Sequence, residues 1–324
     1  MTHSLSGYDA ARRPGGLAVR RRSPRGLLEL RGADRHSFLQ GQVSNDVATL
    51  APGETRHAAL LDTTGHILAD LFVHAFPDSL IVETDPACFA ALHGTLDKFL
   101  IMEDVALADV SDRWAILSVL GDGTAALLLQ LPDDLTATVR PLTYPLAPGF
   151  DLWLPAADAP AAEKRLSNAG AGPLSEDAAE ALRVEAGFPA WGLELTPAVL
   201  LPEAGMADAV SYTKGCYVGQ EIVARLHARG HTNRALRHVL LAANAPVPPP
   251  GTTLNGTEDG PEPGREIGWI TSAVHSPHFG GRALALAYVR KEYLAEGTPV
   301  AVQITQPGGL VFAHAGEVRS LPGG

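Results

Sequence analysis

The last third of the chain contains short apolar stretches and no good helical pattern, and this feature constrains the fold more than any other. Glycine, proline and polar residues bound the stretches, as is typical of strands joined by turns. They cover residues 236–241, 267–274, 283–289, 299–305 and 310–313, and a proline-rich segment at 246–250 separates the first two. Four or five such strands predict a small antiparallel β-barrel that begins near Leu236.

The first two-thirds of the chain has a different pattern, in which short strands alternate with helices. The predicted strands are 27–30, 56–61, 67–73, 80–83 and 114–120, and the predicted helices are 34–40, 86–99, 125–131, 161–169 and 175–186. This alternation predicts α+β layers. Because 324 residues are many for one core, we expect two α+β lobes in residues 1–235 and a barrel domain in 236–324.

The N-terminal segment is rich in arginine and poor in acidic residues. Such a start is one mark of an organelle transit peptide. Pro14, Gly15 and Gly16 interrupt it, however, and an amphipathic targeting helix would not tolerate them well. We therefore favour a flexible basic leader over residues 1–16.

Composition excludes several classes of protein. Hydrophobic residues make up 46% of the chain, which is enough to bury a sizeable core. The net charge of −11 argues against a general nucleic-acid-binding protein. No apolar run approaches the roughly 20 residues of a membrane span. The two cysteines, Cys88 and Cys216, cannot form a disulfide framework, so we expect a reducing compartment such as the cytoplasm.

The most informative motif for function is Lys-Gly-Cys-Tyr-Val-Gly-Gln-Glu at residues 214–221. It places Cys216 near glycines and a lysine, shortly before a short helical pattern that Gly230 ends. A thiol near a helix N-terminus and beside Lys214 favours the reactive thiolate form. A buried cysteine in a tight turn is the alternative, since free cysteines are often buried. Cys88 lies in an apolar helical pattern, where burial should shield it and raise its pKa.

This motif resembles the signature of the YgfZ-type folate-binding proteins, which belong to the superfamily of the glycine-cleavage T-protein, an aminomethyltransferase. Further blocks resemble that superfamily more loosely, and together they extend from about residue 17 to about residue 318. These blocks lie at 38–46, 183–189, 191–195, 268–272 and 285–289. The resemblance implies a three-lobed T-protein-like arrangement, with two α+β lobes and a C-terminal antiparallel β-barrel.

The resemblance also implies a tetrahydrofolate site. Glu185 matches the superfamily's acidic residue, whose carboxylate can accept two adjacent hydrogen bonds from a pterin edge; a surface glutamate at a helix end is the alternative. Trp191 and Tyr217 are candidates to stack on the ring. Arg225 and Arg229 lie one helical turn apart and suit the glutamate tail of a folate, although a solvated helix face explains such a pair equally well.

Asp70 is the candidate for assisting chemistry at a folate nitrogen. In the aminomethyltransferase branch two adjacent acids stand at this point, whereas here the pair is Ala69-Asp70. Cys216, His227, His231 and His238 do not have the spacing of a strong metal site. A complete iron–sulfur site needs about four protein ligands, so this chain would hold a cluster only with another molecule's help.

Three functions remain open. The first is a tetrahydrofolate-binding accessory protein that supports iron–sulfur cluster assembly or repair, including in tRNA-modifying enzymes, with Cys216 as the functional thiol. Its partners would be iron–sulfur enzymes or assembly factors, with no direct contact to nucleic acid or membrane. The second is a folate-dependent aminomethyl or one-carbon transferase. The third is a binding module in which Cys216 only packs. The intact cysteine motif and the missing acid favour the first.

Overall fold

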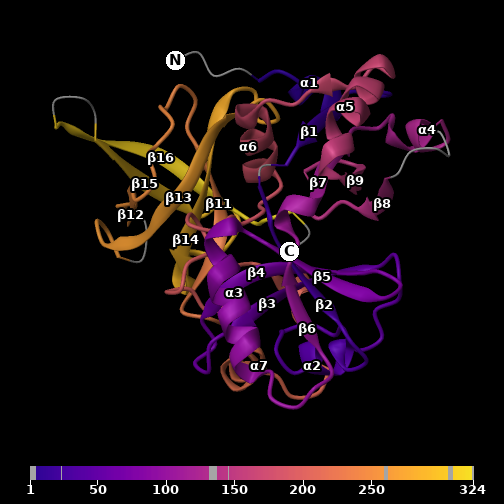
Figure 1. Cartoon of the computed structure of the whole chain (residues 1–324). Helices are drawn as coiled ribbons and strands as arrows, with labels where there is room; N and C mark the ends of the chain where they lie inside the picture. Colours follow the sequence, from indigo (N-terminus) through magenta and orange to yellow (C-terminus); the bar gives the residue numbers. More distant parts are fainter. Residues whose placement is uncertain are drawn as a thin grey trace. The chain divides into compact units, whose positions relative to one another are not determined.

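The computed structural model describes residues 5–22, 24–130, 137–144, 146–258, 262–305 and 309–322. The chain forms two compact units (Figure 1). The first unit comprises Met1–Ala179 and Asp208–Gln220, and the second comprises Glu180–Ala207 and Glu221–Gly324. The second unit therefore contains the barrel together with two segments, 180–207 and 221–235, that the sequence boundary at residue 235 assigned to the α+β lobes.

One sheet of the first unit has the strand order β3-β4-β5-β2-β6, with all neighbours antiparallel. Its strands are β2 (Gly26–Arg31), β3 (Thr55–Leu61), β4 (Ile67–Ala75), β5 (Ser79–Thr84) and β6 (Ala106–Asp109). Helix α2 (Arg35–Gln40) precedes β3, and helix α3 (Pro86–Phe99) packs on β4 and β2. The Asp85 carboxylate accepts a hydrogen bond from the Ala87 N–H, so the predicted start of α3 has a true N-cap.

The second sheet of the first unit has the order β10-β1-β7-β9-β8. Its strands are β1 (Ala18–Arg21), β7 (Trp114–Leu120), β8 (Thr138–Pro141), β9 (Gly149–Pro155) and β10 (Gly172–Pro173), and its helices are α4 (Thr124–Leu128) and α5 (Ala159–Asn168). Leu27 and Ile81 of the first sheet share one buried cluster with Ile116 and Trp153 of the second. The two sheets therefore pack on a common apolar core, as the expected α+β layering requires.

The second unit contains a closed barrel with the order β11-β14-β13-β12-β15-β16, antiparallel throughout. Its strands are β11 (Arg234–Leu241), β12 (Thr253–Gly256), β13 (Glu266–Ser276), β14 (Arg282–Arg290), β15 (Pro299–Thr305) and β16 (Val311–Arg319). Val239, Ile270, Ala285 and Val302 belong to its buried core. The barrel prediction is confirmed, and β12 is a strand that the sequence did not reveal.

Two helices end at the glycines that the sequence predicted as their stops. Helix α6 (Glu176–Glu185) is followed by Gly187 with φ 68°, and helix α7 (Gln220–Arg229) by Gly230 with φ 73°. Positive φ is a conformation that glycine adopts without steric cost, which is why both helices end there.

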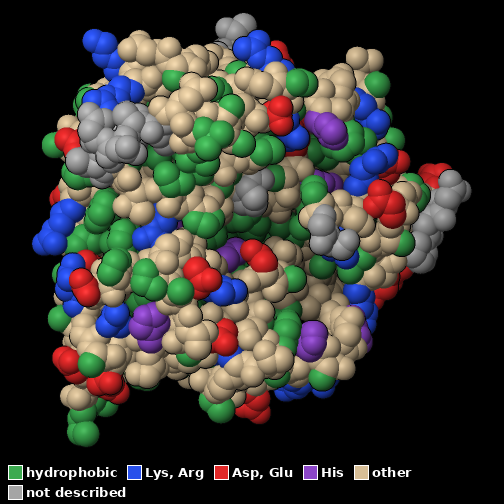
Figure 2. Space-filling view, turned by 90° about the vertical axis from the view of Figure 1, so that its right-hand side faces the viewer, with side chains coloured by type: hydrophobic (Ala, Val, Ile, Leu, Met, Phe, Trp, Pro, Cys, Tyr) green, Lys and Arg blue, Asp and Glu red, His purple; other side chains and the backbone are tan. Residues whose placement is uncertain are grey.

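The segment expected to be a flexible leader, residues 1–16, contains a helix in the part that the structure describes. Residues Tyr8–Arg12 form helix α1, with Tyr8 and Ala11 buried. The buried side chains of Tyr8 and Ala11, one helical turn apart, hold this helix on the fold. The arginine content of the segment did not predict that it would be helical. No helix among the described residues is long and apolar enough to cross a membrane. On the face shown in Figure 2, acidic and basic side chains are interspersed.

Candidate functional site

The two thiols occupy opposite environments. Cys216 is exposed, whereas Cys88 is buried inside helix α3. Burial raises the pKa of the Cys88 thiol to about 12. Since the thiolate is the nucleophile and the metal ligand, Cys88 is suited to packing, and Cys216 is the thiol that can react with a molecule in solution.

The segment that carries Cys216 is fixed by Lys214. The Lys214 ammonium donates hydrogen bonds to the carbonyl oxygens of Gln40, Val43 and Asn45, at 2.7, 2.6 and 2.9 Å. Three charge-assisted bonds from one ammonium use all its donors and hold residues 214–216 against the loop at 40–45. The sequence predicts that the Lys214 charge acts on the thiol, whereas in the structure the ammonium is committed to this loop.

Further bonds tie the same two segments together. Ser44 Oγ donates to the Ala209 carbonyl at 2.6 Å, and the Asn45 amide donates to the Asp208 carbonyl at 2.7 Å. The Ser211 N–H donates to the Ser44 carbonyl at 3.0 Å. Two blocks that lie about 170 residues apart in sequence therefore form one structural unit, and the Cys216 loop has a rigid base.

Tyr217 lies beside this lysine. The Lys214 Nζ atom is 5.0 Å from the centroid of the Tyr217 ring, within the range of a cation–π contact. Burial lowers the pKa of Lys214 to about 8 and raises that of Tyr217 to about 12. The ring is half-buried, so one part of it supports the loop and another remains accessible.

Asp70 is buried on β4 and bonded to a histidine. His57 Nε2 lies 2.7 Å from Asp70 Oδ1, and His57 Nδ1 lies 2.9 Å from Asp208 Oδ2. The imidazole also stacks on Phe72, with ring centroids 4.4 Å apart. Burial alone would lower the pKa of His57, but the two carboxylates outweigh it and raise the pKa to about 10. At neutral pH Asp70 is thus the partner of an imidazolium.

Glu185 lies in the second unit, at the end of α6, and is buried. Its Oε1 atom accepts hydrogen bonds from Ser276 Oγ at 2.5 Å and from the His278 N–H at 3.3 Å. It is therefore not the surface glutamate that the alternative interpretation described. These two donors hold the carboxylate in one position beside the barrel.

A neighbouring ion pair that the sequence did not single out organises this block. Arg183 donates to Glu194 at 2.9 Å and to the Phe188 carbonyl at 2.6 Å. Glu194 is fully buried and also accepts hydrogen bonds from Thr271 and Ser272 on β13. The only sequence signal was that Arg183 lies in the same resemblance block as Glu185 and that Glu194 lies in the next one. Their bonds hold the chain on either side of Glu185 to the barrel.

The other predicted site residues are more open. Trp191 is half-buried, in the loop after Glu185, and forms an isolated bridge with Leu195. Arg225 and Arg229 are exposed on α7. Glu185, Trp191 and these two arginines belong to the second unit, whereas Asp70, Cys216 and Tyr217 belong to the first. Among the described residues, no group of three or more His, Cys, Asp or Glu side chains could hold a metal ion.

Two family models match the chain. The model of the GCVT N-terminal domain matches residues 21–144, and that of the glycine cleavage T-protein C-terminal barrel domain matches residues 234–316. The chain belongs to the glycine cleavage T-protein superfamily. Both matches agree with the fold, since the first covers the sheet of β2–β6 and the second covers the barrel.

Relatives within the superfamily are distant. An aminomethyltransferase of Exiguobacterium sibiricum is 29% identical over 293 residues, which cover 84% of this chain and 78% of that protein. A putative chloroplastic transferase of Arabidopsis thaliana is 25% identical over 296 residues, which cover 86% of this chain and 66% of that protein. The crystal structure of the glycine cleavage system aminomethyltransferase T from Bartonella henselae matches with a TM-score of 0.84 at 23% identity, covering 97% of this chain and 88% of that one. This last likeness shows the common fold.

Proposed function

We propose that this superfamily member is a YgfZ-type, tetrahydrofolate-binding accessory protein that supports iron–sulfur cluster assembly or repair in the cytoplasm. Its clients would include tRNA-modifying enzymes. The observation that carries the proposal is the exposed Cys216 on a loop that Lys214 fixes through three carbonyls. An accessible thiol on a rigid base is suited to meet a partner protein in one defined orientation.

The thiol would act together with groups from the partner. A cluster needs about four ligands, and the described residues of this chain contain no such set around Cys216. Cys216 would therefore serve as a single ligand or as a redox thiol for a cluster that the client enzyme or an assembly factor holds. This role needs a reduced thiol, which the cytoplasm maintains.

The folate would bind through Glu185, whose carboxylate is positioned by Ser276 and His278. A carboxylate fits the adjacent N–H and amino donors of a pterin edge. Trp191 and Tyr217 would contribute stacking surfaces, and Arg225 and Arg229 would attract the glutamate tail. Bound tetrahydrofolate would supply a reduced one-carbon carrier, and these residues would hold and orient it.

A folate-dependent aminomethyltransferase is the second candidate, and the names of several relatives favour it. Two features of the chain weigh against it. Ala69 replaces one of the two adjacent acids of that branch, and the remaining Asp70 is bonded to His57. A carboxylate that already accepts a hydrogen bond from a buried imidazole has fewer lone pairs left for a substrate amine.

The test separates the thiol, the folate and the transferase activity. In cells lacking this protein, Cys216→Ser should fail to restore the activity of iron–sulfur enzymes, whereas the matched variant Cys88→Ser should restore it. Purified Cys216→Ser should bind tetrahydrofolate as the wild type does. If Cys216→Ser restores the enzymes fully, the thiol has no such role. Turnover of an aminomethylated carrier protein at rates typical of an enzyme would favour the transferase instead.

A further inference from the structure

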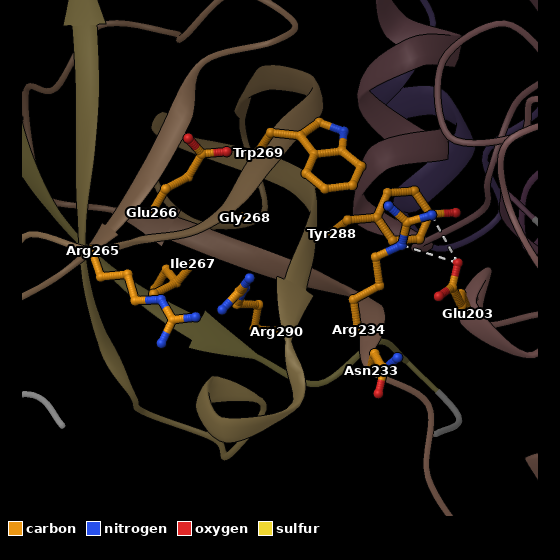
Figure 3. A pocket seen from close by; sticks show the side chains of 10 residues that line it. All are labelled: Glu203, Asn233, Arg234, Arg265, Glu266, Ile267, Gly268, Trp269, Tyr288 and Arg290. Atoms are coloured by element: carbon orange, nitrogen blue, oxygen red, sulfur yellow. Dashed lines mark hydrogen bonds and ion pairs between the residues drawn. The ribbon is translucent and has the colours of Figure 1, made fainter. Parts of the chain in front are cut away.

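A cavity of about 640 Å³ lies within the second unit, on strands β11, β13 and β14 and outside the residues proposed above (Figure 3). Its volume is in the range of about 300–1,000 Å³ that small-molecule sites occupy. The wall combines three arginines with a tryptophan, a tyrosine and an asparagine, and it includes two glutamates. This composition points to a ligand that is anionic at one end and flat at the other.

Arg234 forms the fixed cation of the cavity. Its Nε atom donates to Glu203 at 3.0 Å, and its Nη2 atom donates to the Ala198 carbonyl at 3.1 Å. The guanidinium carbon lies 4.9 Å from the centroid of the Trp269 ring and 5.3 Å from that of Tyr288. Held on two sides and stacked on aromatic rings, this guanidinium is preorganised and presents its Nη1 edge without reorientation.

Arg290 supplies a cation that the protein does not neutralise. Its side chain is exposed and has no hydrogen-bond or ion-pair partner in the part of the chain that the structure describes, while its backbone pairs with Arg234 in the barrel. In Figure 3 its guanidinium lies between those of Arg265 and Arg234. Arg265 forms an ion pair with Glu262 at the rim of the cavity. Fixed and free guanidinium groups around one cavity match a phosphate or carboxylate, which accepts several N–H bonds.

The flat part of the ligand follows from Trp269 and Asn233. Trp269 is half-buried and lines the cavity, so its indole offers a surface on which an aromatic ring can stack. Asn233 adds an amide with both donors and an acceptor, which suits the edge of a heterocyclic base. The net charge of −11 and the glutamates in the wall disfavour a polyanionic strand.

We infer that this cavity binds a free nucleoside monophosphate. The phosphate contacts Arg290 and the Nη1 edge of Arg234, the base stacks on Trp269, and Asn233 contacts the base edge. Arg265 closes the rim over the bound ligand. The site adds a second small-molecule ligand to the barrel, and it does not depend on the proposed folate or thiol function.

Calorimetry and tryptophan fluorescence on the full chain test the site. The probes are AMP, GMP, CMP and UMP, with adenosine, inorganic phosphate and a six-nucleotide single-stranded RNA as comparisons. At least one nucleotide should bind, and adenosine and phosphate should each bind at least about tenfold more weakly than that nucleotide, because each lacks one half of the contacts. Its affinity should fall as salt is raised.

Variants assign the binding to the cavity. Arg290→Gln should weaken nucleotide binding at least about tenfold and leave the fold intact, since Arg290 is exposed. Trp269→Leu should remove the fluorescence response and weaken binding. Arg56→Gln, an exposed arginine of the first unit, should change nothing. No nucleotide binding, or binding that Arg290→Gln leaves unchanged, would overturn the inference. So would phosphate binding as tightly as the best nucleotide, or RNA binding more tightly.

Discussion

Replacing His57 tests how the first unit holds the segment that leads to Cys216. Asp70 and Asp208 raise the pKa of His57 to about 10, against 6.5 for a free histidine. A shift of this size corresponds to about 5 kcal/mol between the two protonation states. The Asp208 side chain is 72% exposed, so solvent screens its share of the interaction. We therefore expect the ion pairs of protonated His57 with Asp70 and Asp208 to contribute about 2–4 kcal/mol to the free energy of unfolding.

The sign of the pH dependence follows from the raised pKa. The native state holds the proton more tightly than the unfolded state, so the stabilisation is complete below about pH 6.5. It declines between pH 6.5 and 10 and is absent above pH 10. The variant His57→Gln cannot bind the proton. The difference in unfolding free energy between wild type and His57→Gln should therefore be largest near pH 6 and shrink as the pH rises.

Urea unfolding at pH 6, 7.5 and 9.5 measures this difference. The matched variant is His275→Gln, because His275 is exposed and its ring contacts a backbone carbonyl rather than a carboxylate among the described residues. His275→Gln should show no comparable dependence on pH. If the loss of unfolding free energy in His57→Gln stays constant from pH 6 to pH 9.5, His57 stabilises the fold by packing on Phe72. The stabilising role of its ion pairs with Asp70 and Asp208 would then be refuted.

Three further predictions concern the thiols, the carboxylate and the lysine. Iodoacetamide at neutral pH should label Cys216 at least a hundredfold faster than Cys88, as mass spectrometry would show; equal rates would contradict the difference in burial. Glu185→Gln should weaken tetrahydrofolate binding by about 1.5–3 kcal/mol in calorimetry, and an unchanged affinity would exclude it as the pterin anchor. Lys214→Met should lower the unfolding free energy by about 2–4 kcal/mol, whereas Lys98→Met on α3 should have little effect; similar values would show that the three carbonyl contacts add nothing.

Much of the architecture was predictable because its signals are local. Helix α3 begins at a capping aspartate followed by proline, and its buried residues recur at helical spacing. Strands β4 and β5 and most of the barrel strands are apolar stretches bounded by turn residues. The contrast between the two thiols was equally local, because an apolar helix surrounds Cys88 and glycines flank the loop of Cys216.

Strand β9 shows where local signals end. It carries Asp151 in its centre, a residue that disfavours strands. In the fold this aspartate is fully buried, and it accepts hydrogen bonds from Ser118 on β7 and from Thr143. The Arg22 guanidinium also lies 3.3 Å from Asp151 Oδ2. These partners make the strand possible, and they come from distant parts of the sequence.

The sequence by itself determined the barrel, the α+β layers, the ends of the helices and which thiol is accessible, because periodicity, caps and glycines act over a few residues. Only the tertiary structure decided what the charged groups do. The ammonium of Lys214 reaches carbonyls more than 160 residues away, and His57 joins Asp70 to Asp208. A buried charge must find partners to offset its desolvation, and those partners are selected by the folded chain rather than by their neighbours in sequence.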